Sequence, residues 1–204
     1  MVGSMFAPVH YTIFQTPIGD CAMAWGSNGI VGFRLPMDDE VQLRESVLAQ
    51  QPHACLWAQS DPLELEILAA TIRITKLLSG VRDDLRSIAI DIIAVPPFHR
   101  RVYAVTRNIL PGQTRTYGEI AAELGEPGAA RAVGAALGAN PIPVIVPCHR
   151  VLAAGGRSGG FTAPGGVKTK FRLLTIEKAR IGNSPTLFDD DETFVLDARK
   201  RPAD

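Results

Sequence analysis

Short apolar stretches separated by turn residues dominate the first third of the chain. VHYTIFQT, GDCAMAWG and GIVGFRLP each have the length and composition of a β-strand, and Asn28-Gly29 between the last two is a strong hairpin signal. Two segments with helical periodicity follow, DDEVQLRESVLAQ and DPLELEILAATIRITKLLSG, each led by an Asp suited to an N-cap. SIAIDIIAV then predicts a further strand. The pattern predicts a small α/β unit that ends near residues 94–97.

After Pro96-Pro97 the apolar periodicity becomes helical. FHRRVYAVTRNI predicts a helix that stops at Pro111-Gly112, and TYGEIAAELGE predicts a short helix with a capping box between Thr116 and Glu119. GAARAVGAALGAN follows across a Pro-Gly turn, so these two short segments predict a helix-turn-helix.

The predicted fold class is therefore α/β (α+β). A small strand-rich N-terminal α/β domain occupies residues 1–95, and a mainly helical domain with the helix-turn-helix occupies residues 96–182. Residues 183–204 form an acidic tail whose composition predicts flexibility.

The second helix of the helix-turn-helix is made almost entirely of Ala and Gly, with Arg131 as its large polar side chain. So slim a helix can approach another surface closely, with the Arg projecting from it. It can equally pack tightly inside the protein, and the pattern alone leaves both interpretations open.

The segment PIPVIVPCHRV leads to an adjacent cysteine and histidine. Pro141, Pro143 and Pro147 fix φ and remove backbone donors, which predicts an extended strand that ends at Cys148. A reactive thiol needs a nearby base or positive charge. Neighbouring side chains of a strand point to opposite faces, so direct contact between Cys148 and His149 is not expected. Taken alone, the pair is better explained as a buried Cys beside a structural His.

Composition narrows the class of protein. The 204 residues are 46% hydrophobic, enough for a substantial core, and three widely spaced cysteines favour a reducing compartment over a disulfide framework. The sequence has no CxxC pair, no signal-peptide pattern and no apolar stretch near the ~18 residues of a membrane span. We therefore expect a cytoplasmic, soluble, monomeric protein without a metal site or a membrane.

The net charge of zero conceals a strong sorting of charge along the chain. Residues 1–97 hold 6 Lys and Arg against 11 Asp and Glu, whereas residues 98–178 hold 11 against 4. A basic segment is typical of a surface that meets a polyanion, although a solvated surface is the commoner explanation of charge alone.

Three segments together resemble one known family. TYGEIA, RAVGAALGANPIPVIVPCHRV and GGVKTKFRLLTIE are similar to the C-terminal domain of the O6-alkylguanine-DNA alkyltransferases, also called methylated-DNA–protein-cysteine methyltransferases. The resemblance is dense from about Phe98 to Glu177, and the first 95 residues share only the layout of the family's variable N-terminal domain. It implies a DNA repair protein that needs no cofactor.

The resemblance assigns roles to the residues of these motifs. Cys148 becomes the alkyl acceptor, His149 the general base that reaches the thiol through a water, and Glu177 the residue that orients His149. Asn140 becomes the hinge between the recognition helix and the active-site segment, and Tyr117 the residue that crowds the 3′ phosphate and assists rotation of the nucleotide.

The same resemblance implies that the Ala- and Gly-rich second helix of the helix-turn-helix contacts DNA. Arg131 would enter the base stack in place of the extruded nucleotide, because an alkylated guanine oxygen is inaccessible inside a duplex. The small residues Ala132, Gly134 and Ala135 would let the helix backbone sit in the shallow minor groove.

The substrate pocket is the least regular part of the resemblance. It comprises Val151, Phe161, Thr162, Ala163 and Lys170, with Phe161 as the pocket aromatic and Lys170 as the family lysine. Backbone groups near Val151, Thr162 and Ala163 would read the guanine edge. Two extra residues around Ala163 and Pro164 depart from the family pattern and are expected to reshape the pocket.

The sequence thus predicts single-turnover transfer of a methyl or small alkyl group from guanine O6, and by extension thymine O4, in double-stranded DNA to Cys148. The alternatives are a lesion-binding module that flags damage without repairing it, and a cysteine hydrolase, for which no other signature is present. In the tail, Ser184-Pro-Thr-Leu187-Phe188 is similar to the peptide that binds the bacterial sliding clamp. A tail that folds back over its own apolar patch is the favoured alternative.

Overall fold

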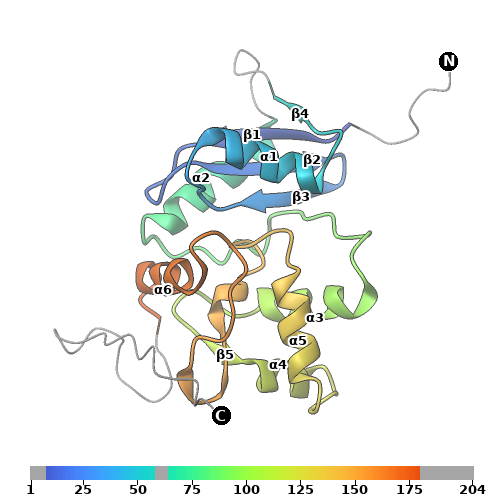
Figure 1. Cartoon of the computed structure of the whole chain (residues 1–204), viewed down its shortest axis with the longest axis vertical. Coiled ribbons are helices and arrows are strands. Elements are labelled where there is room, and N and C mark those ends of the chain that lie inside the picture. Colours follow the sequence, from blue (N-terminus) through green and yellow to red (C-terminus); the bar gives the residue numbers. More distant parts are fainter. Residues whose placement is uncertain (1–7, 58–63, 180–204) are drawn as a thin grey trace, which may run out of the picture.

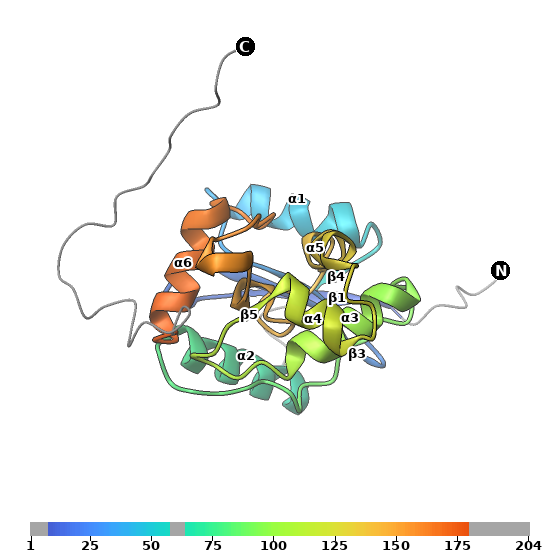
Figure 2. The same ribbon diagram turned by 90° about the horizontal axis from the view of Figure 1, so that it is seen from below.

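The structure is a computed structural model that describes residues 8–57 and 64–179. It is a mixed α/β fold in which a strand-rich N-terminal half lies above a helical C-terminal half (Figure 1). Figure 2, seen from below, shows α1 and α2 on opposite sides of the N-terminal sheet.

A four-stranded sheet with the order β3-β2-β1-β4 forms the N-terminal half. The elements are β1 (His10–Phe14), β2 (Cys21–Gly26), β3 (Gly29–Arg34), α1 (Glu40–Gln50), β4 (Cys55–Leu56) and α2 (Leu65–Leu78). The three predicted strands are present and form an antiparallel meander that includes the hairpin at Asn28-Gly29, and β4 adds a short parallel pair beside β1. Both predicted helices are present.

The C-terminal half contains short elements and is held mainly by helices. They are α3 (Pro97–Arg107), β5 (Arg115–Thr116), α4 (Tyr117–Glu123), α5 (Ala130–Gly138), the 3₁₀ turn Cys148–Arg150, β6 (Val151–Leu152), the turn Ala154–Gly156 and α6 (Gly166–Ile176). The predicted capping box is formed, because Thr116 Oγ1 accepts from Glu119 N and Glu119 accepts from Thr116 N. Helices α4 and α5, joined through residues 124–129, are the two helices of the predicted helix-turn-helix.

The two halves share a core that reaches the active-site segment. Alternate residues of β2 face opposite ways: Ala22 and Ala24 pack on α1, whereas Cys21, Met23 and Trp25 pack toward α2. The latter cluster also contains Ile142, Val144 and Ile145 from the segment that leads to Cys148. The segment is therefore anchored in the core of the N-terminal half.

The predicted strand SIAIDIIAV is wrong. Its residues form an irregular connection with one isolated bridge, Ile30 to Ile90, and two hydrogen bonds, in which Ile30 N donates to Ala89 O and Asp91 N donates to Ile30 O. The apolar run indicated burial only in part, because Ile88 is 8% exposed whereas Ile93 is 75% exposed.

The N-cap prediction holds for one of the two N-terminal helices. Asp39 caps α1 and accepts from Gln42 N. Helix α2 instead starts after Glu64, whose side chain makes no capping bond, and Asp61 lies outside the described residues.

Candidate active site

The segment before Cys148 is a compact loop, and the predicted extended strand is wrong. Val144 has a φ of 73°, in the left-handed region that β-branched residues rarely adopt. The chain thus reverses, with Val146 N donating to Ile142 O at 2.9 Å and one bridge between Pro143 and Val146. The three prolines stiffen a turn, and Cys148 opens a 3₁₀ turn immediately after Pro147.

The side chain of Asn140 closes this loop and contacts the sulfur. Its Nδ2 donates to Val146 O at 2.8 Å and lies 3.3 Å from Cys148 Sγ, while its Oδ1 accepts from Ile142 N at 3.0 Å. Asn140 therefore ties the two ends of the loop together and places a hydrogen-bond donor beside the thiol.

The thiol of Cys148 is surrounded by opposing influences. Burial raises its pKa above the ordinary value, while the hydrogen bond from Asn140 and the positive charge of Lys170 act in the opposite direction. The buried Cys21 serves as a contrast, because burial raises the pKa of that thiol to about 12. Cys148 remains 8% exposed and is accessible from a cavity.

A buried charge network lies behind the sulfur. Glu177, at the C-cap of α6, accepts a bidentate pair from Arg150 Nε and Nη2 at 2.9 and 2.7 Å, and its Oε1 is 3.0 Å from His149 Nε2. Arg150 also donates to Ile109 O at 2.6 Å. Burial alone would raise the pKa of Glu177, but His149 and Arg150 together lower it to about 2, so the carboxylate is ionised at neutral pH.

The ionised carboxylate fixes the tautomer of His149. Because a carboxylate only accepts, Nε2 carries the proton and Nδ1 is the basic nitrogen. Burial lowers the pKa of His149, and Glu177 acts in the opposite direction, so the ring is neutral. Nδ1 is buried and has no protein hydrogen-bond partner. It is therefore free to accept a proton, although no hydrogen bond joins the His149 ring to Sγ among the described residues.

A cavity of about 540 Å³ leads from the surface to Cys148. Its walls come from the start of α4, from α5 and from the loop after β6; they include Tyr117, Arg131, Gly134, Ala153, Phe161 and Thr162. The cavity thus brings together some of the predicted DNA-binding residues, Tyr117, Arg131 and Gly134, and two of the predicted pocket residues, Phe161 and Thr162.

Helix α5 presents a small-residue face to solvent beside this opening. Arg131, Ala132 and Ala135 are exposed, whereas Val133, Ala136 and Leu137 are buried. The interpretation of inward packing therefore holds for one face of α5, while the other face, with Arg131, is exposed, so that its approach to another surface stays a prediction.

The loop from Ala153 to Gly160 rests on the ring of Tyr117. Gly159 has a φ of 62°, and a Cβ there would lie 2.7 Å from the Tyr117 hydroxyl, so only glycine fits. Lys170 supports the loop from beneath, with Nζ donating to Val151 O and Ser158 O at 2.6 Å each. Burial lowers the pKa of Lys170 to about 8.

Three of the predicted pocket residues do not line this cavity. Val151 and Lys170 are fully buried behind its wall. Ala163 faces a different cavity, together with Asn140 and Pro143. Sequence reasoning missed Arg150, since a lone Arg in a motif does not reveal that it is 1% exposed and paired with Glu177.

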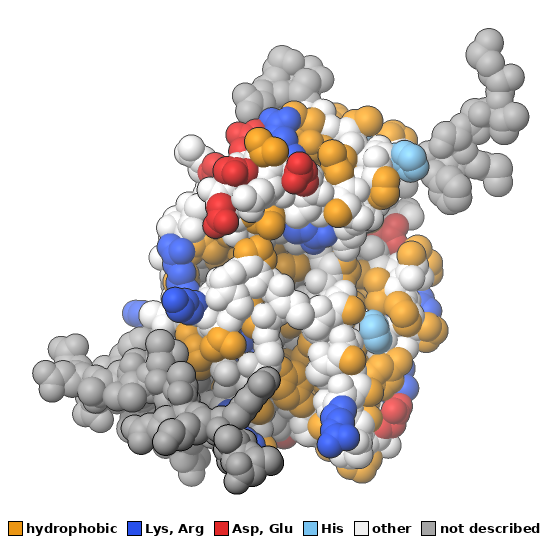
Figure 3. Space-filling view, viewed as in Figure 1, with side chains coloured by type: hydrophobic (Ala, Val, Ile, Leu, Met, Phe, Trp, Pro, Cys, Tyr) orange, Lys and Arg blue, Asp and Glu red, His pale blue; other side chains and the backbone are white. Residues whose placement is uncertain are grey.

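Within residues 8–57 and 64–179, no cluster of three or more His, Cys, Asp and Glu residues is arranged to hold a metal ion. None of the helices in these ranges is both long and apolar enough to cross a membrane. On the face shown in Figure 3, acidic side chains gather over the upper half, while most of the basic ones lie lower.

Comparison with known proteins places the helical half in one class. Residues 97–179 match the family described as 6-O-methylguanine DNA methyltransferase, DNA binding domain. This range contains Cys148, the charge network and both helices at the cavity mouth.

Relatives extend the likeness to most of the chain. A methylated-DNA–protein-cysteine methyltransferase of Mycobacterium leprae is 35% identical over 182 residues, covering 89% of this chain and 99% of the relative. The relative from Mycobacterium tuberculosis is 52% identical over 92 residues, a match that spans only about half of it, 54%. The crystal structure of M. tuberculosis OGT in complex with DNA has a TM-score of 0.67 at 33% identity, covering 83% of this chain and 92% of that one. The chain belongs to the methylated-DNA–protein-cysteine methyltransferase family.

Removal of Arg150 is expected to destabilise the protein strongly. Arg150→Met leaves the Glu177 carboxylate buried with only a neutral histidine, which should lower the free energy of unfolding by about 3–5 kcal/mol, measured by urea denaturation at pH 7. The double variant Arg150→Met with Glu177→Met removes both charges and should recover much of that loss. Equal instability of the single and double variants would contradict the ion-pair explanation.

Proposed function

We propose that this protein repairs DNA by transferring a methyl or small alkyl group from O6 of guanine to Cys148. The observation that carries the proposal is the position of Sγ, which borders a cavity also lined by Arg131 and Tyr117, while His149, the next residue along the chain, is paired with Glu177. The family relatives share the name of this activity, and one was crystallised with DNA.

The chemistry follows from the tautomer of His149. Nδ1 takes the thiol proton through an intervening water, and the thiolate attacks the alkyl carbon. The S–C bond forms as the C–O6 bond breaks, and guanine leaves with the electron pair on O6 and regains a proton. Glu177 keeps its charge throughout and stabilises the imidazolium, while Asn140 stabilises the thiolate through its Nδ2 contact.

Access to the lesion requires extrusion of the nucleotide, because the sulfur is buried. The exposed face of α5, with Ala132 and Ala135, lies against the minor groove, and Arg131 fills the space that the base leaves. Tyr117, held under the Gly159 loop, faces the backbone of the extruded nucleotide. Backbone groups of Thr162 and its neighbours then contact the base.

The thioether product is stable to water, so each molecule acts once; O4-alkylthymine is a second substrate in this proposal. The chain acts as a cytoplasmic monomer that needs no cofactor. The competing function is that of a module which binds the lesion without transferring the alkyl group. The thiol of Cys148, which accepts a hydrogen bond from Asn140, favours transfer.

The identity of the acceptor is tested by intact mass. Incubation with a duplex that contains O6-methylguanine should add one methyl group per molecule, located at Cys148 by peptide mapping. Cys148→Ser should show no increment and should still bind the lesion, because phosphate contacts supply most of the affinity. Cys21 and Cys55 are internal controls: a methyl group on either would refute the assignment, and tight binding with unchanged mass would support the binding module.

Extrusion is tested by comparing two substrates. Arg131→Ala should slow transfer from duplex DNA by at least about ten-fold. The variant loses the side chain that stabilises the duplex after extrusion, a step that costs a few kcal/mol and that only the duplex substrate requires. The rate with free O6-alkylguanine base should change little. Arg131→Lys serves as the matched control that keeps the charge. Equal losses on both substrates would mean that Arg131 has a structural role.

The tail hypothesis concerns residues outside the described part of the chain. We retain as a proposal that Leu187 and Phe188 bind the bacterial sliding clamp, on the sequence pattern alone. A titration of a peptide covering residues 180–204 against the clamp should show binding that is lost on replacing both residues with alanine. Binding that survives the replacement, or none at all, would end the proposal.

A further inference from the structure

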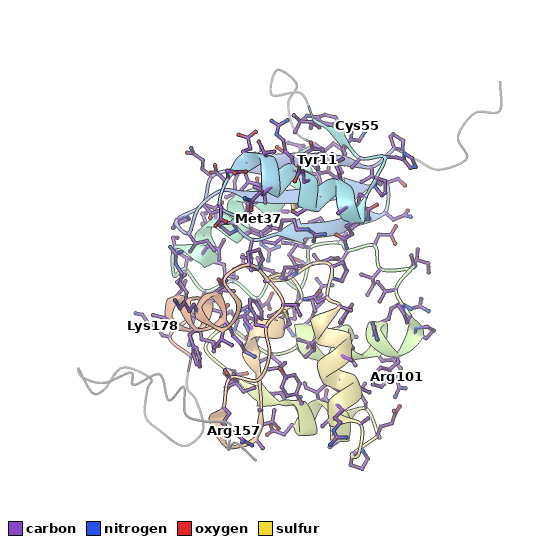
Figure 4. All side chains as sticks on the ribbon, viewed as in Figure 1. Tyr11, Met37, Cys55, Arg101, Arg157 and Lys178 are labelled. Atoms are coloured by element: carbon purple, nitrogen blue, oxygen red, sulfur yellow. The ribbon has the colours of Figure 1, made fainter. Side chains whose placement is uncertain are left out.

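Cys148 borders a second cavity, on the side that faces the N-terminal sheet. This cavity measures about 450 Å³ and is lined on the sheet side by Arg34, Met37 and Ser46. Met37 lies on the part of the upper half that faces the lower half (Figure 4). Cys148, Phe161 and Thr162 line both cavities. The sulfur therefore stands between two spaces.

The proposed reaction gives the second space a use. In a displacement at carbon, the sulfur, the carbon and the leaving O6 lie roughly in line, so any substituent on that carbon points to the side. With guanine in the cavity beside Tyr117 and Arg131, a methyl group needs no further room. A longer alkyl group needs space beside Sγ, which the second cavity offers.

Arg34 brings a positive charge to the lining of the second cavity. Its Nε donates to Ser46 O at 3.2 Å, its Nη1 donates to Phe33 O and Pro141 O at 3.0 and 3.3 Å, and its Nη2 donates to Gln50 Oε1. All four acceptors are neutral. No Asp or Glu of the described ranges forms an ion pair with it, whereas the paired arginines Arg44, Arg73 and Arg86 each have one.

The guanidinium is also connected to Cys148 through two residues of the active-site loop. Pro141, which accepts from Nη1, follows Asn140, whose Nδ2 is 3.3 Å from Sγ. Burial lowers the pKa of Arg34, as expected for a half-buried cation without a carboxylate, yet an arginine stays charged. Its five N–H groups exceed the four acceptors named above. An anion in the cavity would be favoured.

We propose that the second cavity accepts alkyl groups that end in a carboxylate, such as a carboxymethyl group on guanine O6, with Arg34 facing the carboxylate. This rests on the proposed function and names a substrate class for it. The thiolate attacks the methylene carbon, the C–O6 bond breaks, guanine leaves with the electron pair and is protonated, and S-carboxymethylcysteine remains. Arg34 offsets the repulsion between the thiolate and the carboxylate.

The test compares three duplexes that carry O6-methyl-, O6-carboxymethyl- or O6-isobutylguanine. Isobutyl has the branching of carboxymethyl without its charge. Single-turnover rates are followed by intact mass for the native chain and for Arg34→Met. The ratio of the carboxymethyl to the methyl rate should fall by at least about ten-fold in the variant, and the isobutyl to methyl ratio should not fall. Arg86→Met, which removes an arginine paired with Asp84, is the control.

A second variant protects the test against misfolding. Ser46→Asp places a carboxylate beside Arg34 while leaving the guanidinium and its bond to Pro141 in place, and it should cause the same selective loss. Equal falls for all three substrates would show that Arg34 acts only through the loop and would overturn the proposal. So would native chain that transfers methyl but not carboxymethyl groups. A native chain that transfers no methyl group would instead refute the proposed function itself.

Discussion

A carboxylate with 6% exposure must be compensated within the protein, and the way Glu177 is compensated determines the geometry around Cys148. Arg150 and His149 both bind this carboxylate, and they are the two residues that follow Cys148 in its 3₁₀ turn. The turn can therefore take only an arrangement in which both side chains reach the C-terminal end of α6. Arg150 also binds Ile109 O, so the connection after α3 is drawn into the same arrangement.

The sulfur itself is held by neutral groups as well as by charge. Asn140 contacts it from the loop side, and Lys170 supports the opposite wall through two backbone carbonyls. Burial opposes ionisation of the thiol, and these neighbours counteract it without removing the penalty. The thiol therefore lies among groups that favour its ionisation, in surroundings whose burial opposes it.

The sequence predicted the elements that have a strong local signal. The hairpin at Asn28-Gly29, the capping box at Thr116 and the slim helix α5 follow from side-chain preferences over a few residues, and all are present. The motif around Cys148 also indicated which residues meet. What it missed depends on tertiary contacts: the apolar run at residues 87–95 forms only one isolated bridge, and Val144, whose side chain packs into the N-terminal core, takes a left-handed conformation. Local propensity cannot reveal that Arg150 is enclosed or that Arg34 lies beside the active-site loop.

The bond from Arg34 to Pro141 joins residues that are 107 positions apart, and Phe33 N donates to the same carbonyl. Contacts of this separation form late in folding, because closing so long a loop loses chain entropy before any contact stabilises it. Glu177 comes after all of these residues in the sequence. During synthesis from the N-terminus, the residues of the N-terminal sheet, the loop and Cys148 are therefore present before the carboxylate that orders the turn. During synthesis, Cys148 is therefore an ordinary cysteine in an unfinished fold, and it acquires its special surroundings only when α6 docks.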